Sequence, residues 1–258
     1  MSHTIWLGPV FAQQVQAAVL PESTLHVVQV SDQAQAAPIL ASWKDADGNY
    51  VPKMLSQLGI PPGATILLAS FSAGHDLAAY LTLSLADRAL FAALLLADSA
   101  QSSWADQART LGNVPAGYLA FAQEAAAGQR VMVASDSTFS ASSYASSSQT
   151  MANLAAQLAL PAVDASSASS PPPLSAVGAG ELLLLDYGQQ VSHSEHATAL
   201  AAQLVSNVVV PWLAAPPATP EEQPPNPPGA PSRLGWGLAA LAGLGLGAYL
   251  LSRPRRTR

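Results

Sequence analysis

The chain has 258 residues, of which 50% are hydrophobic and 10% are charged, a balance that supplies one ordinary core and argues against a disordered protein. The formal net charge is −6, and Lys and Arg form no cluster before the C-terminus, so no nucleic-acid partner is expected. The sequence contains no Cys, which excludes disulfides, thiolate metal sites and a Cys nucleophile.

The first 60 residues predict two strands and one helix. The N-terminus lacks the basic and apolar regions of a signal peptide, and residues 4–7 predict a short strand before a Gly-Pro turn. A second strand is expected over residues 25–30. Apolar residues at near-helical spacing between Gly48 and Gly59 predict a helix.

The next segment predicts a strand, a sharp turn and a helix in direct succession. Residues 64–70 form a continuous apolar run that is too short for a helix, and residues 76–87 have a helical pattern. Three further apolar runs follow, each with an Asp shortly after it: residues 91–97 before Asp98, residues 130–134 before Asp136, and residues 181–185 before Asp186.

Strands that read as continuous apolar runs and alternate with helices predict a mostly parallel sheet with helices on both faces. We therefore expect an α/β domain over residues 1–213 with a sheet of about six strands. Ligands of such sheets bind at the carboxyl ends of the strands, where Ser72, Asp98 and Asp136 fall.

Ser72 is the candidate nucleophile. The turn that contains it reads Ser70-Phe71-Ser72-Ala73-Gly74, close to the Gly-x-Ser-x-Gly turn in which small residues let strand and helix approach around the reactive Ser. Ser70 departs from the first Gly of that pattern but is still small. The alternative is a Ser in an ordinary loop between strand and helix.

The general base of such a site is a His that follows the nucleophile and the acid along the chain. Of the five His residues, only His193 and His196 come after the last expected strand. His193 precedes a helix expected to begin near Glu195, so it can point over the strand ends, whereas His196 would lie within the helix. His193 is therefore favoured.

Two residues are candidates for the acid that orients the base. Asp136 follows the penultimate strand, the commonest position, and Asp98 follows the strand next to the nucleophile strand. Capping of the following helix is the alternative role for either residue. For the oxyanion hole, the N–H of Ala73 would act with an N–H from the loop after the first strand, that of Gly8 or Val10, since Pro9 has none.

Four segments resemble a group of small bacterial and phage α/β-hydrolase proteins. They are Phe-Ser-Ala-Gly-His at 71–75, Leu-Leu-Leu-Ala-Asp-Ser at 94–99, the stretch from Tyr118 to Val133, and Ser-Tyr-Ala-Ser-Ser-Ser-Gln-Thr at 143–150. The resemblance covers roughly residues 60–212. It implies a trimmed α/β-hydrolase fold and favours Asp98 over Asp136 as the acid, but it implies no substrate.

These candidates predict a serine hydrolase, most simply a carboxylic-ester hydrolase that works through an acyl-enzyme on Ser72, with His193 and Asp98. Its partner is a small-molecule ester, and no cofactor or metal is expected. One alternative is a catalytically silent scaffold of the same fold that serves as a membrane-tethered binding module. Another is a serine peptidase or amidase.

The C-terminal part predicts a membrane anchor. Residues 214–233 are rich in Pro and predict an extended linker, residues 234–251 carry no charge, and residues 252–258 are basic. The alternative is a last helix packed on the domain. Gly243 and Gly247 have the spacing that favours self-association of such helices.

Two features of the sequence predict opposite sides of the membrane for the domain. The positive-inside rule places the basic tail in the cytoplasm and the domain outside, whereas the lack of a signal peptide favours a tail-anchored protein with its domain in the cytoplasm.

Overall fold

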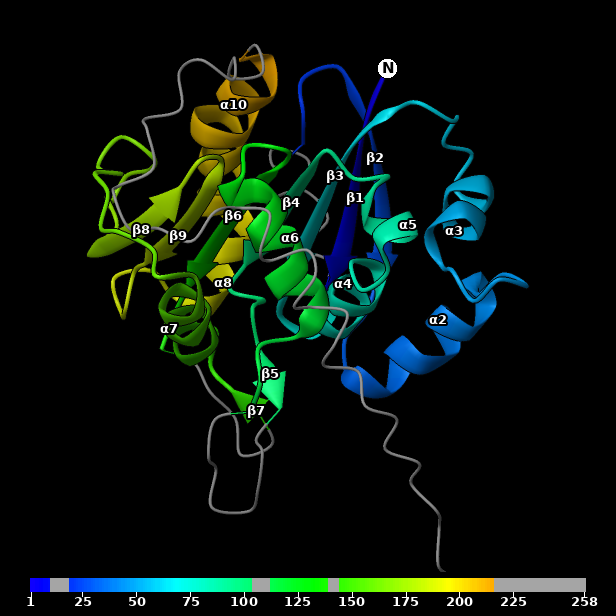
Figure 1. Ribbon diagram of the computed structural model, residues 1–258, viewed down its shortest axis with the longest axis horizontal. Helices are drawn as coiled ribbons and strands as arrows, with labels where there is room; N and C mark the ends of the chain where they lie inside the picture. The colour runs from blue at the N-terminus through cyan, green and yellow to red at the C-terminus, as the bar shows by residue number, and fades with distance from the viewer. Residues whose placement is uncertain (10–18, 104–111, 139–143, 216–258) are drawn as a thin grey trace, which may run out of the picture. The chain divides into compact units, whose positions relative to one another are not determined.

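A computed structural model describes residues 1–9, 19–103, 112–138 and 144–215 of the chain. A seven-stranded sheet runs through these residues in the order β2-β1-β3-β4-β6-β9-β8 (Figure 1). All neighbouring strands are parallel except β8 and β9. The strands of this sheet are β1 (Ser2–Gly8), β2 (Ser23–Gln29), β3 (Thr65–Phe71), β4 (Ala93–Ala97), β6 (Val131–Asp136), β8 (Ser175–Ala179) and β9 (Leu182–Asp186).

The helices and a small second sheet complete the domain. Two short strands, β5 (Ser102–Ser103) and β7 (Tyr144–Ala145), pair antiparallel. The helices before the last strand are η1 (Gln33–Gln35), α2 (Ala36–Trp43), α3 (Val51–Gln57), η2 (Ser72–Gly74), α4 (His75–Leu81), α5 (Leu85–Arg88), α6 (Ala116–Ala126) and α7 (Ser147–Leu158). A helical run with a kink at Thr198 follows β9. Its parts are α8 (His193–Glu195), η3 (His196–Leu200), α9 (Ala201–Leu204), η4 (Val205–Val209) and α10 (Val210–Ala214).

The expected α/β architecture is confirmed, but several elements differ. The helix expected to begin near Glu195 begins at His193, so His193 lies in its first turn rather than in the loop before it. The sheet has seven strands rather than about six, because β8 adds an antiparallel edge. The helix expected over residues 76–87 is two helices, since α4 ends at Leu81 and the Ser84 side chain caps α5 by accepting the N–H of Asp87. Helix α2 has no counterpart among the expected elements.

The central strands alternate their side chains between two cores. Leu94 and Leu96 of β4 belong to a buried cluster with α2, α4, α6 and α7, whereas Leu95 belongs to a second cluster with the C-terminal helical run. Figure 1 shows α4 and α6 in front of the sheet. Because successive side chains of a strand point to opposite faces, burial on both faces requires the continuous apolar runs seen in the sequence.

One helix among the described residues, the run from His193 to Ala214, is long and apolar enough to cross a membrane. Three of its side chains, Leu200, Leu204 and Val209, are at most 3% exposed and pack in the second cluster. The packing of a core helix therefore accounts for its hydropathy.

The chain divides into two units, Met1–Pro217 and Ala218–Arg258. The expected linker beyond residue 215, the apolar segment 234–251 and the basic tail 252–258 lie outside the described residues.

Candidate active site

Ser72 lies at the turn between β3 and α4. Its φ is +50°, in the left-handed region that residues with a side chain seldom adopt. Backbone strain of this kind clusters at functional sites, and a turn of this shape lifts a Ser hydroxyl out of the sheet edge. Ser72 is partly buried.

Small residues allow this turn to form. An added Cβ at Gly74 would lie 2.2 Å from the backbone oxygen of Leu7, and one at Gly8 would lie 2.4 Å from the backbone oxygen of Phe71. The end of β1 therefore packs against the turn with no room for a side chain at either glycine. Ser70, at the position where the pattern has Gly, is buried, and its Oγ lies 2.5 Å from Ser99 Oγ.

The side chains of Asp98 and His193 are hydrogen-bonded to each other beside this turn. Asp98 follows β4 with a φ of +45°, and its Oδ2 lies 2.6 Å from Nδ1 of His193. His193 is the first residue of α8, directly after the cap Ser192. Its ring packs on Phe71, with ring centroids 4.6 Å apart, so the imidazole lies next to the residue that precedes Ser72.

The Asp98 carboxylate is held in its ionised form. Burial by itself would raise the pKa of Asp98, but hydrogen bonds from His193 and Ser137 outweigh it and lower the pKa below its usual value. Ser137 donates its backbone N–H to Oδ1 at 3.1 Å and its hydroxyl to Oδ2. A carboxylate that accepts a bond from Nδ1 fixes the tautomer of a neutral imidazole and leaves Nε2 able to accept a proton.

The alternative base, His196, lies inside the core. Its side chain is fully buried, its Nδ1 lies 2.9 Å from Ser135 Oγ, and its ring meets Tyr187 edge-on. Burial lowers the pKa of His196 to about 4, so the ring is neutral at pH 7. Among the described residues, its Nε2 has no hydrogen-bond partner.

The alternative acid, Asp136, faces Asp186 rather than a His. The two residues are register partners at the ends of β6 and β9 and line one cavity. Burial, and secondly the charge of Asp186, raise the pKa of Asp136 to about 8. A carboxyl group in its neutral form at pH 7 provides no anionic partner for an imidazolium.

This raised pKa predicts a pH dependence of stability. As the pH rises from about 4 to about 8, Asp136 releases its proton in the unfolded chain but keeps it in the folded chain, so its contribution to stability falls through that window. Asp136→Asn should therefore lose less unfolding free energy between about pH 5 and about pH 8 than the unchanged chain, by more than about 2 kcal/mol. Urea unfolding at the two pH values measures this difference.

The exposed Asp47 provides a matched control for this experiment. Asp47→Asn should follow the pH dependence of the unchanged chain. An Asp136→Asn variant that does the same would contradict a raised pKa at Asp136.

Two of the candidate oxyanion-hole residues lie at the Ser72 turn. Ala73 is the second residue of η2, directly after Ser72, and Gly8 ends β1 where it packs against the turn. Val10, the alternative to Gly8, lies outside the described residues.

Sequence reasoning missed several residues that support this site. Ser137 holds the Asp98 carboxylate, and Ser99 is the partner of Ser70. The buried Tyr118 donates its hydroxyl to the backbone oxygen of His75 at 2.7 Å. Single Ser and Tyr residues follow no spacing rule, so only their positions in the fold reveal these roles.

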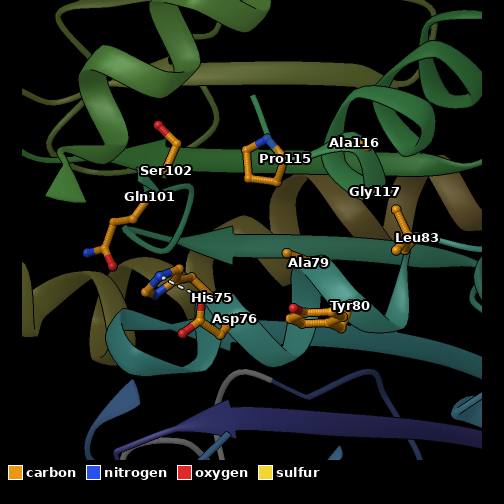
Figure 2. A pocket seen from close by; sticks show the side chains of 10 residues that line it. All are labelled: His75, Asp76, Ala79, Tyr80, Leu83, Gln101, Ser102, Pro115, Ala116 and Gly117. Atoms are coloured by element: carbon orange, nitrogen blue, oxygen red, sulfur yellow. Dashed lines mark ion pairs between the residues drawn. The ribbon is translucent and has the colours of Figure 1, made fainter. Parts of the chain in front are cut away.

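His75, near the start of α4, contributes to a cavity. Its Nδ1 lies 3.0 Å from the backbone oxygen of Ser72, and its Nε2 lies 3.2 Å from Asp76 Oδ1. Figure 2 shows the side chains of His75 and Asp76 together at one end of this cavity.

Comparisons of the chain with protein-family models, with curated proteins and with solved structures find no match.

Proposed function

We propose that the protein is a serine hydrolase with a trimmed α/β-hydrolase fold that cleaves carboxylic esters. The observation that carries this proposal is the left-handed Ser72 between β3 and α4, with the Asp98–His193 pair beside it at the carboxyl edge of the sheet. The candidate nucleophile, base and acid come from three separate connections and follow one another in the chain order that this fold uses, which supports the proposal.

In the first half of the reaction, the Oγ of Ser72 attacks the ester carbonyl carbon while Nε2 of His193 takes the hydroxyl proton. The negative oxygen of the tetrahedral intermediate accepts the N–H of Ala73 and a second N–H, assigned to Gly8. The bond from the carbonyl carbon to the alkoxy oxygen then breaks, and His193 returns its proton to the departing alcohol.

In the second half, water attacks the acyl-enzyme. His193 removes one proton from the water, the bond to Ser72 Oγ breaks, and the proton passes back to Ser72 as the carboxylic acid leaves. Asp98 stays ionised throughout, in keeping with its lowered pKa, and stabilises the imidazolium in both halves.

Labelling with a fluorophosphonate probe tests this proposal without knowledge of the substrate. An activated Ser reacts with the probe, and mass spectrometry should locate the adduct on Ser72. A chain that stays unlabelled, and hydrolyses no p-nitrophenyl ester, would favour the silent scaffold.

A second part of the proposal is that residues 234–251 tether this domain to a membrane. The segment carries no charge, and 18 residues of helix span roughly 27 Å, close to the ~30 Å of the hydrocarbon core. The full chain should stay with membranes in carbonate or high salt and dissolve in detergent, whereas a chain that ends at Ala215 should be soluble and keep its fold. Fractionation of cell extracts measures both.

The double substitution Leu244→Arg and Leu246→Arg is the matched control, because two arginines in the segment oppose insertion at about 3 kcal/mol each. This double substitution should release the full-length chain from the membrane into the soluble fraction. A full-length chain that is soluble without detergent would instead place the last helix on a protein surface and contradict the tether.

A further inference from the structure

The backbone carbonyl oxygen of Ser72 is held by donors from two parts of the fold. It accepts the backbone N–H of His75, at the start of α4. Nδ1 of the His75 side chain lies 3.0 Å from the same oxygen, and since a carbonyl oxygen only accepts, Nδ1 donates this bond. The hydroxyl of Ser99, after β4, donates to it from 3.4 Å. The donors of His75 belong to the turn itself, whereas Ser99 ties the turn to another connection of the sheet.

Ser99 is also bonded to Ser70, the residue that departs from the Gly-x-Ser-x-Gly pattern. The two Oγ atoms lie 2.5 Å apart, and both side chains are fully buried. The single hydroxyl hydrogen of Ser99 is directed to the Ser72 oxygen, so Ser70 donates the bond between the two hydroxyls. The hydrogen bonds therefore run in one direction, from Ser70 to Ser99 to Ser72. We call these two hydroxyls and their bonds the serine network.

The direction of the Ser72 oxygen sets the direction of a candidate oxyanion-hole donor. The carbonyl of Ser72 and the N–H of Ala73 belong to one planar trans peptide group, in which the oxygen and the hydrogen point in opposite directions. Donors that hold the oxygen on one side therefore aim the Ala73 N–H to the other side. The φ of Ser72 is +50°, a strained conformation that persists only where surrounding contacts hold it.

The serine network also connects the turn of the candidate nucleophile with that of the candidate acid. Ser99 directly follows Asp98 in the chain, so its bond to Ser72 joins the two turns. The buried Tyr118 of α6 contacts both connections. Its hydroxyl lies 2.7 Å from the backbone oxygen of His75 and 3.4 Å from that of Ser99.

We propose that Ser99 and Ser70 are positioning residues, whose network fixes the Ser72 peptide group so that the N–H of Ala73 faces the oxyanion of the tetrahedral intermediate. The inference rests on the proposed ester hydrolysis at Ser72. Both side chains are fully buried and act through the peptide group rather than on the substrate. Because the oxyanion bond strengthens as charge develops, loss of the network should slow the chemical step and leave substrate binding nearly unchanged.

A double-mutant cycle tests the serine network. Ser99→Ala should lower kcat for p-nitrophenyl butyrate about tenfold and change KM by less than about twofold, since loss of a whole oxyanion-hole donor costs about 10²-fold or more. Ser70→Ala should lower kcat about threefold to tenfold. Because Ser70 acts through Ser99, the double variant should be no slower than Ser99→Ala. The total amount of fluorophosphonate adduct counts the active sites, so each rate refers to folded protein.

Two outcomes of this cycle would contradict the proposal. One is full kcat in Ser99→Ala. The other is a loss of about 100-fold in the double variant, because effects that multiply show that the two hydroxyls act independently. Ser147→Ala is the matched control and should keep kcat and KM. Ser147 of α7 is also fully buried, and its hydroxyl has no hydrogen-bond partner among the described residues.

Ser70→Gly separates the hydroxyl of residue 70 from its size. If this residue only had to be small, the Gly of the pattern would keep full activity. We expect the opposite, a loss of kcat equal to that of Ser70→Ala, because Gly has no hydroxyl to donate to Ser99. Normal kcat in Ser70→Gly would overturn the role of Ser70. The Ser70 variants also test the network if Ser99→Ala yields no folded protein.

Inhibition by a trifluoromethyl ketone measures the oxyanion contact directly. The Oγ of Ser72 adds to the ketone carbon, the hydroxyl proton passes to Nε2 of His193, and the ketone oxygen becomes an oxyanion that accepts the Ala73 N–H. In Ser99→Ala, the inhibition constant should rise by the same factor by which kcat/KM falls. An unchanged inhibition constant would separate Ser99 from the oxyanion and contradict the proposal.

Fluorophosphonate labelling separates this inference from the proposed function. An adduct on Ser72 in the unchanged chain, together with normal kcat and normal inhibition in Ser99→Ala, would contradict the positioning role alone. An unchanged chain that carries no adduct and hydrolyses no ester would contradict the proposed hydrolase, and the positioning role with it.

Discussion

Replacing Ser72 with Ala should reduce ester turnover by a factor of about 10⁴ or more and abolish the fluorophosphonate adduct. The Oγ of Ser72 forms the covalent bond in the proposed reaction, and a methyl group has no lone pair to donate. The melting temperature should change little, because Ala and Ser both place one Cβ at the same φ of +50°. Initial rates with p-nitrophenyl butyrate and intact mass after labelling measure the two effects.

Ser56→Ala provides the control for this experiment, because Ser56 is an exposed residue near the end of α3. It should retain the rate and the adduct. Full activity in Ser72→Ala would move the nucleophile elsewhere and remove the basis of the proposed function.

Asp98→Asn and His193→Ala should each lower kcat/KM by about 10²-fold or more, since members of a triad act as a unit. The Asn amide cannot balance the charge of an imidazolium and can turn an N–H toward His193, which favours the wrong tautomer. Both variants should also react more slowly with the fluorophosphonate. Rates are compared per folded molecule, with the folded fraction taken from circular dichroism.

Asp136→Asn and His196→Gln are the matched comparisons. Asp136 is already neutral at pH 7, and His196 is buried against Ser135, so these variants should keep activity within a few-fold of the unchanged chain. A large loss of activity in Asp136→Asn and His196→Gln would assign the acid and base roles to Asp136 and His196, provided that Asp98→Asn and His193→Ala keep near-normal rates.

Asp98, the candidate acid, lies at the same edge of the sheet as Ser72, the candidate nucleophile. Ser72 and Asp98 are the first residues after the adjacent strands β3 and β4, and both have left-handed backbones. Parallel strands bring these two turns side by side, so the candidate acid is one strand away from the candidate nucleophile. His193 then reaches Asp98 from the start of the C-terminal helical run.

The sequence by itself determined the α/β class, because strands buried on both faces need apolar residues at every position, as in Leu94, Leu95 and Leu96. It also indicated the Ser72 turn and narrowed the candidates for a general base to two His residues. The edge strand β8 could not be predicted, since its sequence Ser-Ala-Val-Gly-Ala has little strand propensity and its pairing with β9 supplies the stability.

Only the tertiary structure decided which acid and which His meet. Asp98 and Asp136 each follow a buried strand in the sequence. In the fold, the Asp98 carboxylate is hydrogen-bonded to His193 and Ser137. Asp136 instead lies against Asp186. His193 and His196 are three residues apart, and a difference of one turn places one over the strand ends and the other inside the core. These outcomes depend on contacts between residues far apart in the chain, such as the Ser137–Asp98 and His193–Asp98 hydrogen bonds across 39 and 95 positions, which local patterns in a sequence do not encode.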